Sequence, residues 1–232
     1  MGDPIEAILF DLDDTLCTYR RSGQEILSLA FEAIGREPFF TAEGYYEIFD
    51  DFVTDSDSGL ENRQRCFAAL AERAGYSPSV GREVADAYAE ERDQTNVRWL
   101  PGAKEALDVH SPDYSLALIT NGPPEWQIQK IDALGIADRF ETIVYAGYDT
   151  APKPDPEPFH IALDRLNTEP ERAVTVGNSL GSDVAGAHSA GVRSIWLDAD
   201  GIDDPEPAPH HRIETMSDLT DDSRSLFTIA ER

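Results

Sequence analysis

The sequence predicts an α/β protein: a doubly wound, Rossmann-like core with a parallel sheet, and a helical cap domain. Two observations lead to this prediction. Short apolar runs typical of buried strands alternate with amphipathic helical patterns through most of the chain. One long segment near the N-terminus departs from this alternation, because it contains only helical patterns. This segment indicates an insert that is separate from the sheet.

Five apolar runs are interpreted as the strands of the core. Each is followed by polar or turn-prone residues, and helical patterns separate most of them. Strands that alternate with helices favour a parallel sheet covered on both faces, so we expect one such sheet. The runs are 5–10, 116–119, 143–145, 173–176 and 194–197. A short edge strand is expected to begin at Ile213, after the proline-rich loop 203–209.

The helical insert lies between the first and second predicted strands. It contains several amphipathic patterns, with glycine and proline residues between them and no strand pattern. The expected helices span 24–34, 42–53, 62–74 and 80–97. Because the insert leaves after the first strand and returns before the second, we predict a separate cap, residues 18–97, over the active face. The α/β core then consists of residues 1–17 and 98–232.

The chain is strongly acidic. It contains 45 Asp and Glu residues against 19 Lys and Arg, a formal net charge of -26, and its lysines are Lys104, Lys130 and Lys153. This composition, on a chain with a substantial hydrophobic fraction, is interpreted as halophilic, because molar salt shortens the Debye length to about 3 Å and screens self-repulsion. The alternative is an ordinary acidic protein. Either way, no basic stripe favours nucleic acid as a partner.

Other features of the sequence exclude further classes. No apolar run approaches the roughly 20 residues that a membrane-spanning helix needs, so no membrane association is expected. The start, Met1–Pro4, lacks the features of a signal peptide, and two cysteines do not make a disulfide framework. We therefore expect a cytoplasmic protein, and we make no prediction of its oligomeric state.

Four polar motifs follow strands of the predicted sheet. They are Asp11-Leu12-Asp13-Asp14-Thr15, Thr120-Asn121-Gly122, Lys153 within 151–156, and the segment 177–183 with Asn178 and Asp183. In doubly wound sheets, ligands bind at the carboxyl ends of the strands, near a switch in strand order. We therefore expect these motifs to lie together at one edge of the sheet.

The residue types in these motifs suit an anion and a cation. Asp11 and Asp13 are two positions apart, so on an extended segment both carboxylates point the same way and favour sharing a proton or a cation. Thr120 and Asn121 offer a hydroxyl and an amide to anionic oxygens, and a helix expected from near Pro124 aims its N-terminus at them. Lysine is scarce in this chain, so one held between two prolines is interpreted as functional.

These four motifs, in this order, resemble the haloacid dehalogenase superfamily, whose members are mostly phosphatases. The resemblance covers nearly the whole chain, and the helical insert matches the family's cap in position. It implies that Asp11 attacks phosphorus to form an aspartyl-phosphate and that Asp13 acts as general acid and base. It also implies phosphate binding by Thr120, Asn121 and Lys153.

The resemblance further implies a Mg²⁺ ion held by Asp11, Asp13, Asn178 and Asp183. Asn178 departs from the family's pattern, which usually has an aspartate there. An amide oxygen still coordinates a hard cation, but one negative charge is missing, so we expect weakened Mg²⁺ affinity.

The predicted function is Mg²⁺-dependent hydrolysis of a small phosphorylated metabolite. Two alternatives remain: a 2-haloacid dehalogenase-type hydrolase, which the presence of Asp13 disfavours, and a degenerate member that only binds a phosphorylated ligand, which Asn178 favours. Arg20 and Arg21 are interpreted as surface charges. The insert's aromatic residues at 45, 46, 49 and 52 are interpreted as packing.

Overall fold

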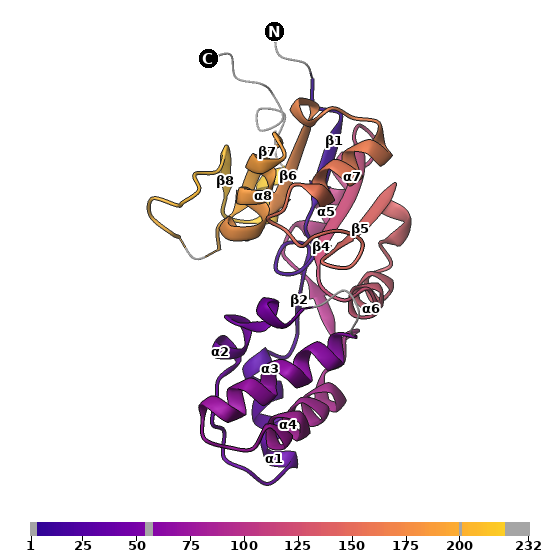
Figure 1. The fold of residues 1–232 in the computed structure, drawn as a ribbon. Helices are drawn as coiled ribbons and strands as arrows, with labels where there is room; N and C mark the ends of the chain where they lie inside the picture. Colours follow the sequence, from indigo (N-terminus) through magenta and orange to yellow (C-terminus); the bar gives the residue numbers. More distant parts are fainter. Residues whose placement is uncertain (1–3, 54–57, 200, 221–232) are drawn as a thin grey trace.

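The core of the protein is a six-stranded parallel sheet with the spatial order β5-β4-β1-β6-β7-β8. The computed structural model describes residues 4–53, 58–199 and 201–220 (Figure 1). The strands are β1 (Ala7–Phe10), β4 (Ser115–Asn121), β5 (Thr142–Ala146), β6 (Ala173–Gly177), β7 (Arg193–Leu197) and β8 (His211–Ile213). The predicted fold class and all five predicted core strands are confirmed.

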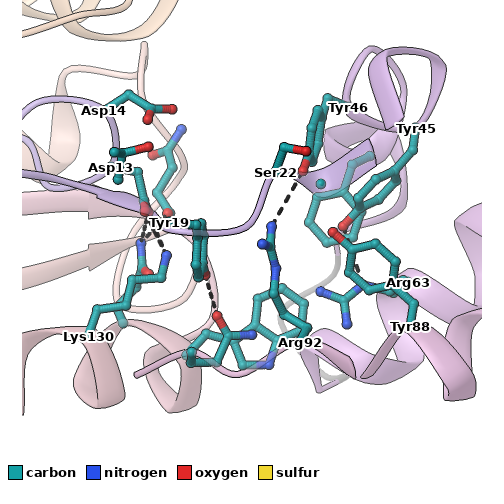
Figure 2. Close-up of a pocket in the computed structure, with 18 of the residues that line it drawn as sticks. Asp13, Asp14, Tyr19, Ser22, Tyr45, Tyr46, Arg63, Tyr88, Arg92 and Lys130 are labelled. Carbon is teal, nitrogen blue, oxygen red and sulfur yellow. Dashed lines mark hydrogen bonds and ion pairs between the residues drawn. The ribbon is translucent and has the colours of Figure 1, made fainter. Parts of the chain in front are cut away.

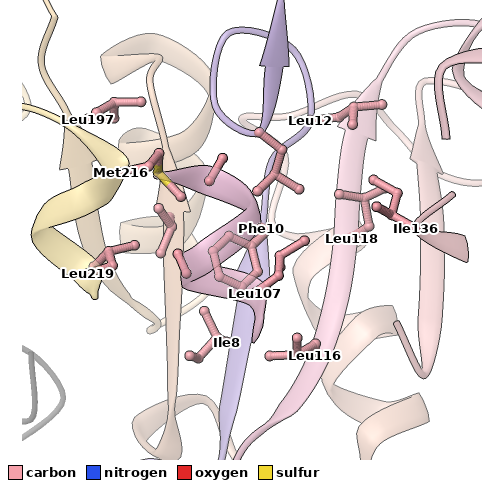
Figure 3. Packing of buried hydrophobic residues seen from close by; sticks show 14 of the residues in the cluster. Ile8, Phe10, Leu12, Leu107, Leu116, Leu118, Ile136, Leu197, Met216 and Leu219 are labelled. Atoms are coloured by element: carbon pink, nitrogen blue, oxygen red, sulfur yellow. The ribbon is translucent and has the colours of Figure 1, made fainter. Parts of the chain in front are cut away.

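Helices cover both faces of this sheet. They are α5 (Ala103–His110), α6 (Pro124–Leu134), α7 (Glu157–Leu166) and α8 (Ala185–Ser189). Short helical turns at 137–139, 170–172, 180–184 and 216–219 complete the connections. Alternate residues of β1 point to opposite faces, so Phe10 packs with Leu107 and Met216 in one hydrophobic cluster (Figure 3), while Leu9 packs with Phe159 in another. Burial on both faces explains why β1 is entirely apolar.

The strand order changes direction beside β1. From β1 the chain passes to β4 and β5 on one side, and then crosses to β6, β7 and β8 on the other. Ligand sites in doubly wound sheets form at such a switch, at the carboxyl ends of the strands. The motifs after β1, β4 and β6 therefore meet at this point.

The insert forms a helical body at the carboxyl end of the sheet (Figure 1). Its helices are α1 (Gly23–Ala33), α2 (Ala42–Tyr46), α3 (Gly59–Arg73) and α4 (Pro78–Glu91). Ser22 and Ser58 begin α1 and α3 with capping boxes, in which a serine oxygen and a glutamate three residues later satisfy unpaired backbone N–H groups. The helices share a hydrophobic cluster of their own, centred on residues such as Phe31 and Phe67.

Several details of the insert differ from the sequence predictions. Two three-residue strands, β2 (Cys17–Tyr19) and β3 (Val97–Trp99), pair antiparallel where the insert meets the core, although no strand was expected between Cys17 and Val97. Strands this short show too few residues for a period of two to be visible. The helix expected at 80–97 accordingly ends at Glu91, and the one expected at 42–53 divides into α2 and a 3₁₀ turn, Phe49–Phe52.

The last strand is also shifted from its prediction. β8 begins at His211 and ends at Ile213, whereas the sequence placed its start at Ile213. His211 already pairs with Ile195 of β7, because the chain is free to join the edge of the sheet once the proline-rich loop has ended. In the described ranges, no helix is long and apolar enough to cross a membrane.

Candidate active site

Asp11 and Lys153 form a buried ion pair at the carboxyl end of β1. The Lys153 Nζ lies 2.8 Å from Asp11 Oδ1, and it also donates to the Ile119 carbonyl at 2.9 Å. Lys153 is 5% exposed and Asp11 is 8% exposed. Strands β1 and β4 are neighbours, so the first and second strand ends bring the aspartate and the carbonyl to the same ammonium group.

Asp183 completes this arrangement from the loop after β6. Its Oδ1 accepts from Lys153 Nζ at 2.6 Å, and its Oδ2 accepts from the Ser179 backbone N–H at 2.9 Å. The carboxylate packs directly over Gly177, where an added Cβ would lie 2.3 Å from the Asp183 Cγ. Glycine at the end of β6 therefore makes room for the carboxylate that orients Lys153.

The buried charges shift one another's pKa values. The pKa of Asp11 is raised to about 7, mainly by burial; Lys153 opposes this rise, and the nearby Asp183 and Asp13 charges add to it. Burial acts to lower the pKa of Lys153, but Asp11 and Asp183 outweigh it and raise that pKa. Lys153 therefore stays charged at any physiological pH.

Asp13 is held by two residues of α6. Lys130 Nζ lies 2.7 Å and 2.8 Å from its two carboxylate oxygens, and Gln127 Nε2 donates to Asp13 Oδ2 at 2.9 Å. Lys130 is 4% exposed, whereas the Asp13 side chain is 36% exposed. Burial acts to lower the pKa of Lys130, but Asp13 and Tyr19 outweigh it and raise that pKa. The Asp13 carboxylate is therefore partly exposed to solvent, while Lys130 and Gln127 hold it in position.

Thr120 and Asn121, the two predicted phosphate-binding residues at the end of β4, form hydrogen bonds that hold other parts of the site in place. Asn121 Nδ2 donates to the Lys153 carbonyl at 3.1 Å, and its Oδ1 accepts from the Lys153 backbone N–H at 3.0 Å. Thr120 is buried, and its Oγ1 accepts from Gln127 Nε2 at 2.6 Å. These hydrogen bonds fix the positions of the Lys153 loop and of helix α6 relative to β4.

The predicted metal ligands are only partly brought together. Thr15 Oγ1 lies 3.0 Å from Asp11 Oδ2 and 3.3 Å from Asn178 Oδ1, so both oxygens lie beside the Thr15 hydroxyl. The carboxylates of Asp13 and Asp183, in contrast, are bonded to lysines. Within the described ranges, no three His, Cys, Asp or Glu side chains form a metal-binding group. The oxygens of Asp11 and Asn178 fit a hard cation that keeps several waters, such as Mg²⁺.

A cavity of about 690 Å³ lies between the core and the helical insert. Asp13, Asn121 and Gly122 line it from the core, and aromatic side chains line it from the insert. Figure 2 shows Asp13 and Lys130 at one end and Arg63, Tyr45 and Tyr88 at the other. Six of the chain's 19 basic residues line this cavity, against three acidic ones. A chain with a net charge of -26 thus has a locally positive cavity that suits an anionic substrate.

Several residues of the site were missed by the sequence analysis. Lys130 and Gln127 lie one turn apart on α6, directly after the Thr120-Asn121-Gly122 motif. The scarcity of lysine could have drawn attention to Lys130, because it is one of only three lysines in the chain. Arg63 and Arg92 come from the middle of α3 and the end of α4, where no local pattern marks them.

Arg20 and Arg21, which were interpreted as surface charges, bond to other residues of the protein. Arg21 forms an ion pair with Glu91 at 3.3 Å, with both side chains 39% exposed. Arg20 Nε donates to the Val97 carbonyl at 3.1 Å. Of the aromatic cluster interpreted as packing, Tyr45 is buried, but Tyr45, Tyr46 and Phe49 also line the cavity.

Comparisons with known proteins show similarity to one family of hydrolases. A family model described as haloacid dehalogenase-like hydrolase matches residues 5–191. A phosphoserine phosphatase from Thermus thermophilus is 32% identical over 246 aligned positions, which cover 93% of this chain and 98% of that one. A solved 2-haloacid dehalogenase from Pseudomonas syringae has a TM-score of 0.63 at 30% identity, covering 93% of this chain and 96% of that one. The magnesium-bound HAD-hydrolase YfnB of Bacillus subtilis has a TM-score of 0.71 at 22% identity, covering 94% and 97%, and so shares the fold.

The close approach at Gly177 predicts a steric requirement there. Gly177→Ala is expected to lower the free energy of unfolding by about 1–3 kcal/mol, because the new methyl group displaces the buried Asp183 carboxylate. Urea unfolding measures the change. Gly181→Ala is the matched control, since a Cβ at Gly181 meets nothing within 4 Å, and it is expected to stay within about 0.5 kcal/mol of the parent. Equal effects of the two variants would contradict the prediction.

Proposed function

The chain belongs to the haloacid dehalogenase-like hydrolase family, and we propose that it is a phosphatase acting on phosphomonoesters of small metabolites. The observation that carries the proposal is the Asp11–Lys153–Asp183 arrangement, with Asp13 beside it at the edge of a positive cavity. A buried carboxylate beside a fixed ammonium group suits nucleophilic attack on a phosphoryl group, because the ammonium balances the charge that develops there.

In the first step of the proposed mechanism, an Asp11 carboxylate oxygen attacks phosphorus in line with the leaving oxygen. A P–O bond to Asp11 forms as the P–O bond to the alcohol breaks. Asp13 enters this step in its protonated form and donates that proton to the departing oxygen. Lys153 neutralises charge on Asp11 and on the transferred group. Lys130 and Gln127 hold the Asp13 carboxylate in position for the proton transfer.

In the second step, a water molecule attacks the phosphorus of the aspartyl-phosphate. Asp13 takes a proton from this water, the P–O bond to Asp11 breaks, and inorganic phosphate leaves with the Asp11 carboxylate restored. Each residue thus returns to its starting protonation state, and one water is consumed for each ester.

A bound Mg²⁺ would be held by Asp11 and Asn178, with water completing its coordination. It would supply positive charge to the phosphoryl oxygens. Asp183 and Asp13 remain candidates for contact through water. The composition supports a cytoplasm at molar salt as the working medium. With a net charge of -26, the acidic side chains repel one another in dilute buffer, and molar salt screens this repulsion.

A second candidate function is hydrolysis of 2-haloacids. The similarity at 30% identity to a solved 2-haloacid dehalogenase favours it. Asp13 argues against it, because halide needs no proton to leave, whereas the alcohol of an ester does. Release of halide from a 2-haloacid, without release of phosphate from phosphomonoesters, would replace the proposed function with this one.

Asp11→Asn is expected to reduce phosphate release by more than about 10⁴-fold, because a neutral amide cannot attack phosphorus. The measurement is hydrolysis of p-nitrophenyl phosphate with millimolar Mg²⁺ in molar KCl. Asp132→Asn is the matched control: Asp132 is exposed and lies outside the cavity, so activity should persist. No turnover by the folded parent protein, or full activity of Asp11→Asn, would overturn the proposed function.

Asn178→Asp is expected to strengthen Mg²⁺ binding by restoring a negative charge beside Asp11. The Mg²⁺ concentration for half-maximal activity should fall by about 10-fold, which corresponds to about 1.4 kcal/mol. A Mg²⁺ titration of activity measures this. A parent protein that is inactive until this change is made would support the non-catalytic alternative for the natural chain.

Lys130→Met is expected to lower kcat by about 10²-fold, because Asp13 loses the group that fixes its position. Steady-state kinetics on p-nitrophenyl phosphate measure the effect. Lys104→Met provides the control, since Lys104 is exposed and lies outside the site. An unchanged kcat in Lys130→Met would show that Asp13 needs no support from α6.

A further inference from the structure

Cations and aromatic rings alternate along the wall of the cavity, starting at the catalytic end. Lys130, which holds Asp13, has its Nζ 4.8 Å from the centroid of the Tyr19 ring. The Arg92 guanidinium carbon lies 3.7 Å from the centroid of that same ring. Tyr19 thus connects the cation at Asp13 with a cation from the end of α4, as Figure 2 shows.

The alternation continues into the helical insert. Arg92 also lies 5.6 Å from the centroid of the Tyr88 ring, and Arg63 lies 4.7 Å from it. Arg63 is in turn 4.3 Å from the ring of Trp126, which belongs to α6 of the core. Arg63 and Arg92 therefore both lie beside the Tyr88 ring. Residues of the core and of the helical insert together form this wall of the cavity.

Neither arginine has a carboxylate partner among the residues that the structure describes. Arg63 is 4% exposed, and its Nε donates to the Tyr45 hydroxyl at 3.4 Å. Arg92 donates to the Arg21 carbonyl at 3.3 Å and to the Tyr46 hydroxyl at 3.4 Å, which are neutral acceptors. Arg92 is partly exposed, but Arg63 is buried. A buried guanidinium without an opposite charge is costly, and the chain has 45 acidic residues that could have provided one.

Tyr88 adds an unpartnered polar group to this part of the cavity wall. Its side chain is 1% exposed, and its hydroxyl forms no hydrogen bond in the described part of the chain. Buried hydroxyl groups almost always have a partner, so a missing one indicates a group supplied from outside the chain. Tyr88 lines the cavity together with Arg63 and Arg92.

We propose that Arg63, Arg92 and the Tyr88 hydroxyl bind a second anionic group of the substrate, a carboxylate or a second phosphate. The preferred substrates are then phosphomonoesters that carry a further anion away from the scissile ester. The proposal rests on the proposed phosphatase function. The aromatic rings lie against the faces of the guanidinium groups, so the N–H groups at their edges that do not donate to Tyr45, Arg21 or Tyr46 are left for an anion. Such edges match the paired oxygens of carboxylates and phosphates.

The cavity has the right extent for such a substrate. It reaches from Asp13 to Arg63, and its volume of about 690 Å³ exceeds what a phosphoryl group alone occupies. A substrate with two anions would place its ester phosphate at the core end, beside Asp11 and Asp13, and its other anion against the arginines. It would thereby contact core and insert together.

The test compares esters that differ in the second anion. One pair is 3-phosphoglycerate and glycerol 3-phosphate, which tests a carboxylate. The other is ribulose 1,5-bisphosphate and ribulose 5-phosphate, which tests a second phosphate. In the parent protein, kcat/KM for the doubly anionic member of one pair should exceed that for its partner by at least about 10²-fold. The pair that shows the preference identifies the anion.

Variants then locate the preference. Arg63→Gln should lower the ratio of the two kcat/KM values by at least about 10-fold. Arg73→Gln, on the same helix but exposed and outside the cavity, should leave it unchanged. Tyr88→Phe removes only the unpartnered hydroxyl, so it should fold with an equal or higher melting temperature and still lower the ratio. The inference is overturned if the parent protein shows no preference, or if neither Arg63→Gln nor Tyr88→Phe reduces it.

A binding measurement separates failure of this inference from failure of the proposed function. Trp126 lies against Arg63, so tryptophan fluorescence of Asp11→Asn can follow binding of 3-phosphoglycerate and ribulose 1,5-bisphosphate without turnover. If the parent protein hydrolyses no phosphomonoester, the proposed function fails. The arginine site then stands only if a doubly anionic ester binds at least about 10-fold more tightly than its partner and Arg63→Gln abolishes the difference.

Discussion

The contact of the Lys153 ammonium group with the carboxylates of Asp11 and Asp183 is the interaction on which the rest of the site depends. Three charged groups, each more than nine-tenths buried, are stable together only when their geometry compensates for lost hydration. That requirement explains several neighbours. Gly177 leaves space for one carboxylate, and Asn121 holds the backbone of the lysine on both sides. Asp11 follows β1, Asn121 ends β4 and Asp183 follows β6, which are three adjacent strands. Lys153 comes from the loop after β5, the strand next to β4.

The basic residues of the chain are distributed unevenly between the site and the rest of the molecule. A net charge of -26 would repel an anionic substrate from most of the surface. Two of the three lysines lie in the site, and four further arginines besides Arg63 line the adjoining cavity. The positive charge that the chain retains is thus concentrated where a phosphate group would bind, and the walls of the cavity keep water from screening it fully.

The helical insert takes part in the site and does more than cover it. Its own hydrophobic cluster holds α1 to α4 together, so the insert keeps its shape while the β2–β3 ribbon connects it to the core. Tyr19 in β2 and Trp126 in α6 both stack on arginines that the insert carries. In the proposed function, recognition of the substrate beyond its phosphate is therefore shared between two parts of the chain. The proposed catalytic residues all belong to the core.

The sequence by itself determined the fold class, the five core strands and the order of the four motifs. These follow from local patterns: apolar runs of strand length, helical periodicity, and polar residues directly after each strand. It did not predict the partners of Asp13, the β2–β3 pairing or the arginines around Tyr88. Those contacts join residues far apart in the chain, such as Lys130 with Asp13 and Arg63 with Trp126. Only the tertiary structure decides them, because no local pattern records which side chains a fold brings face to face.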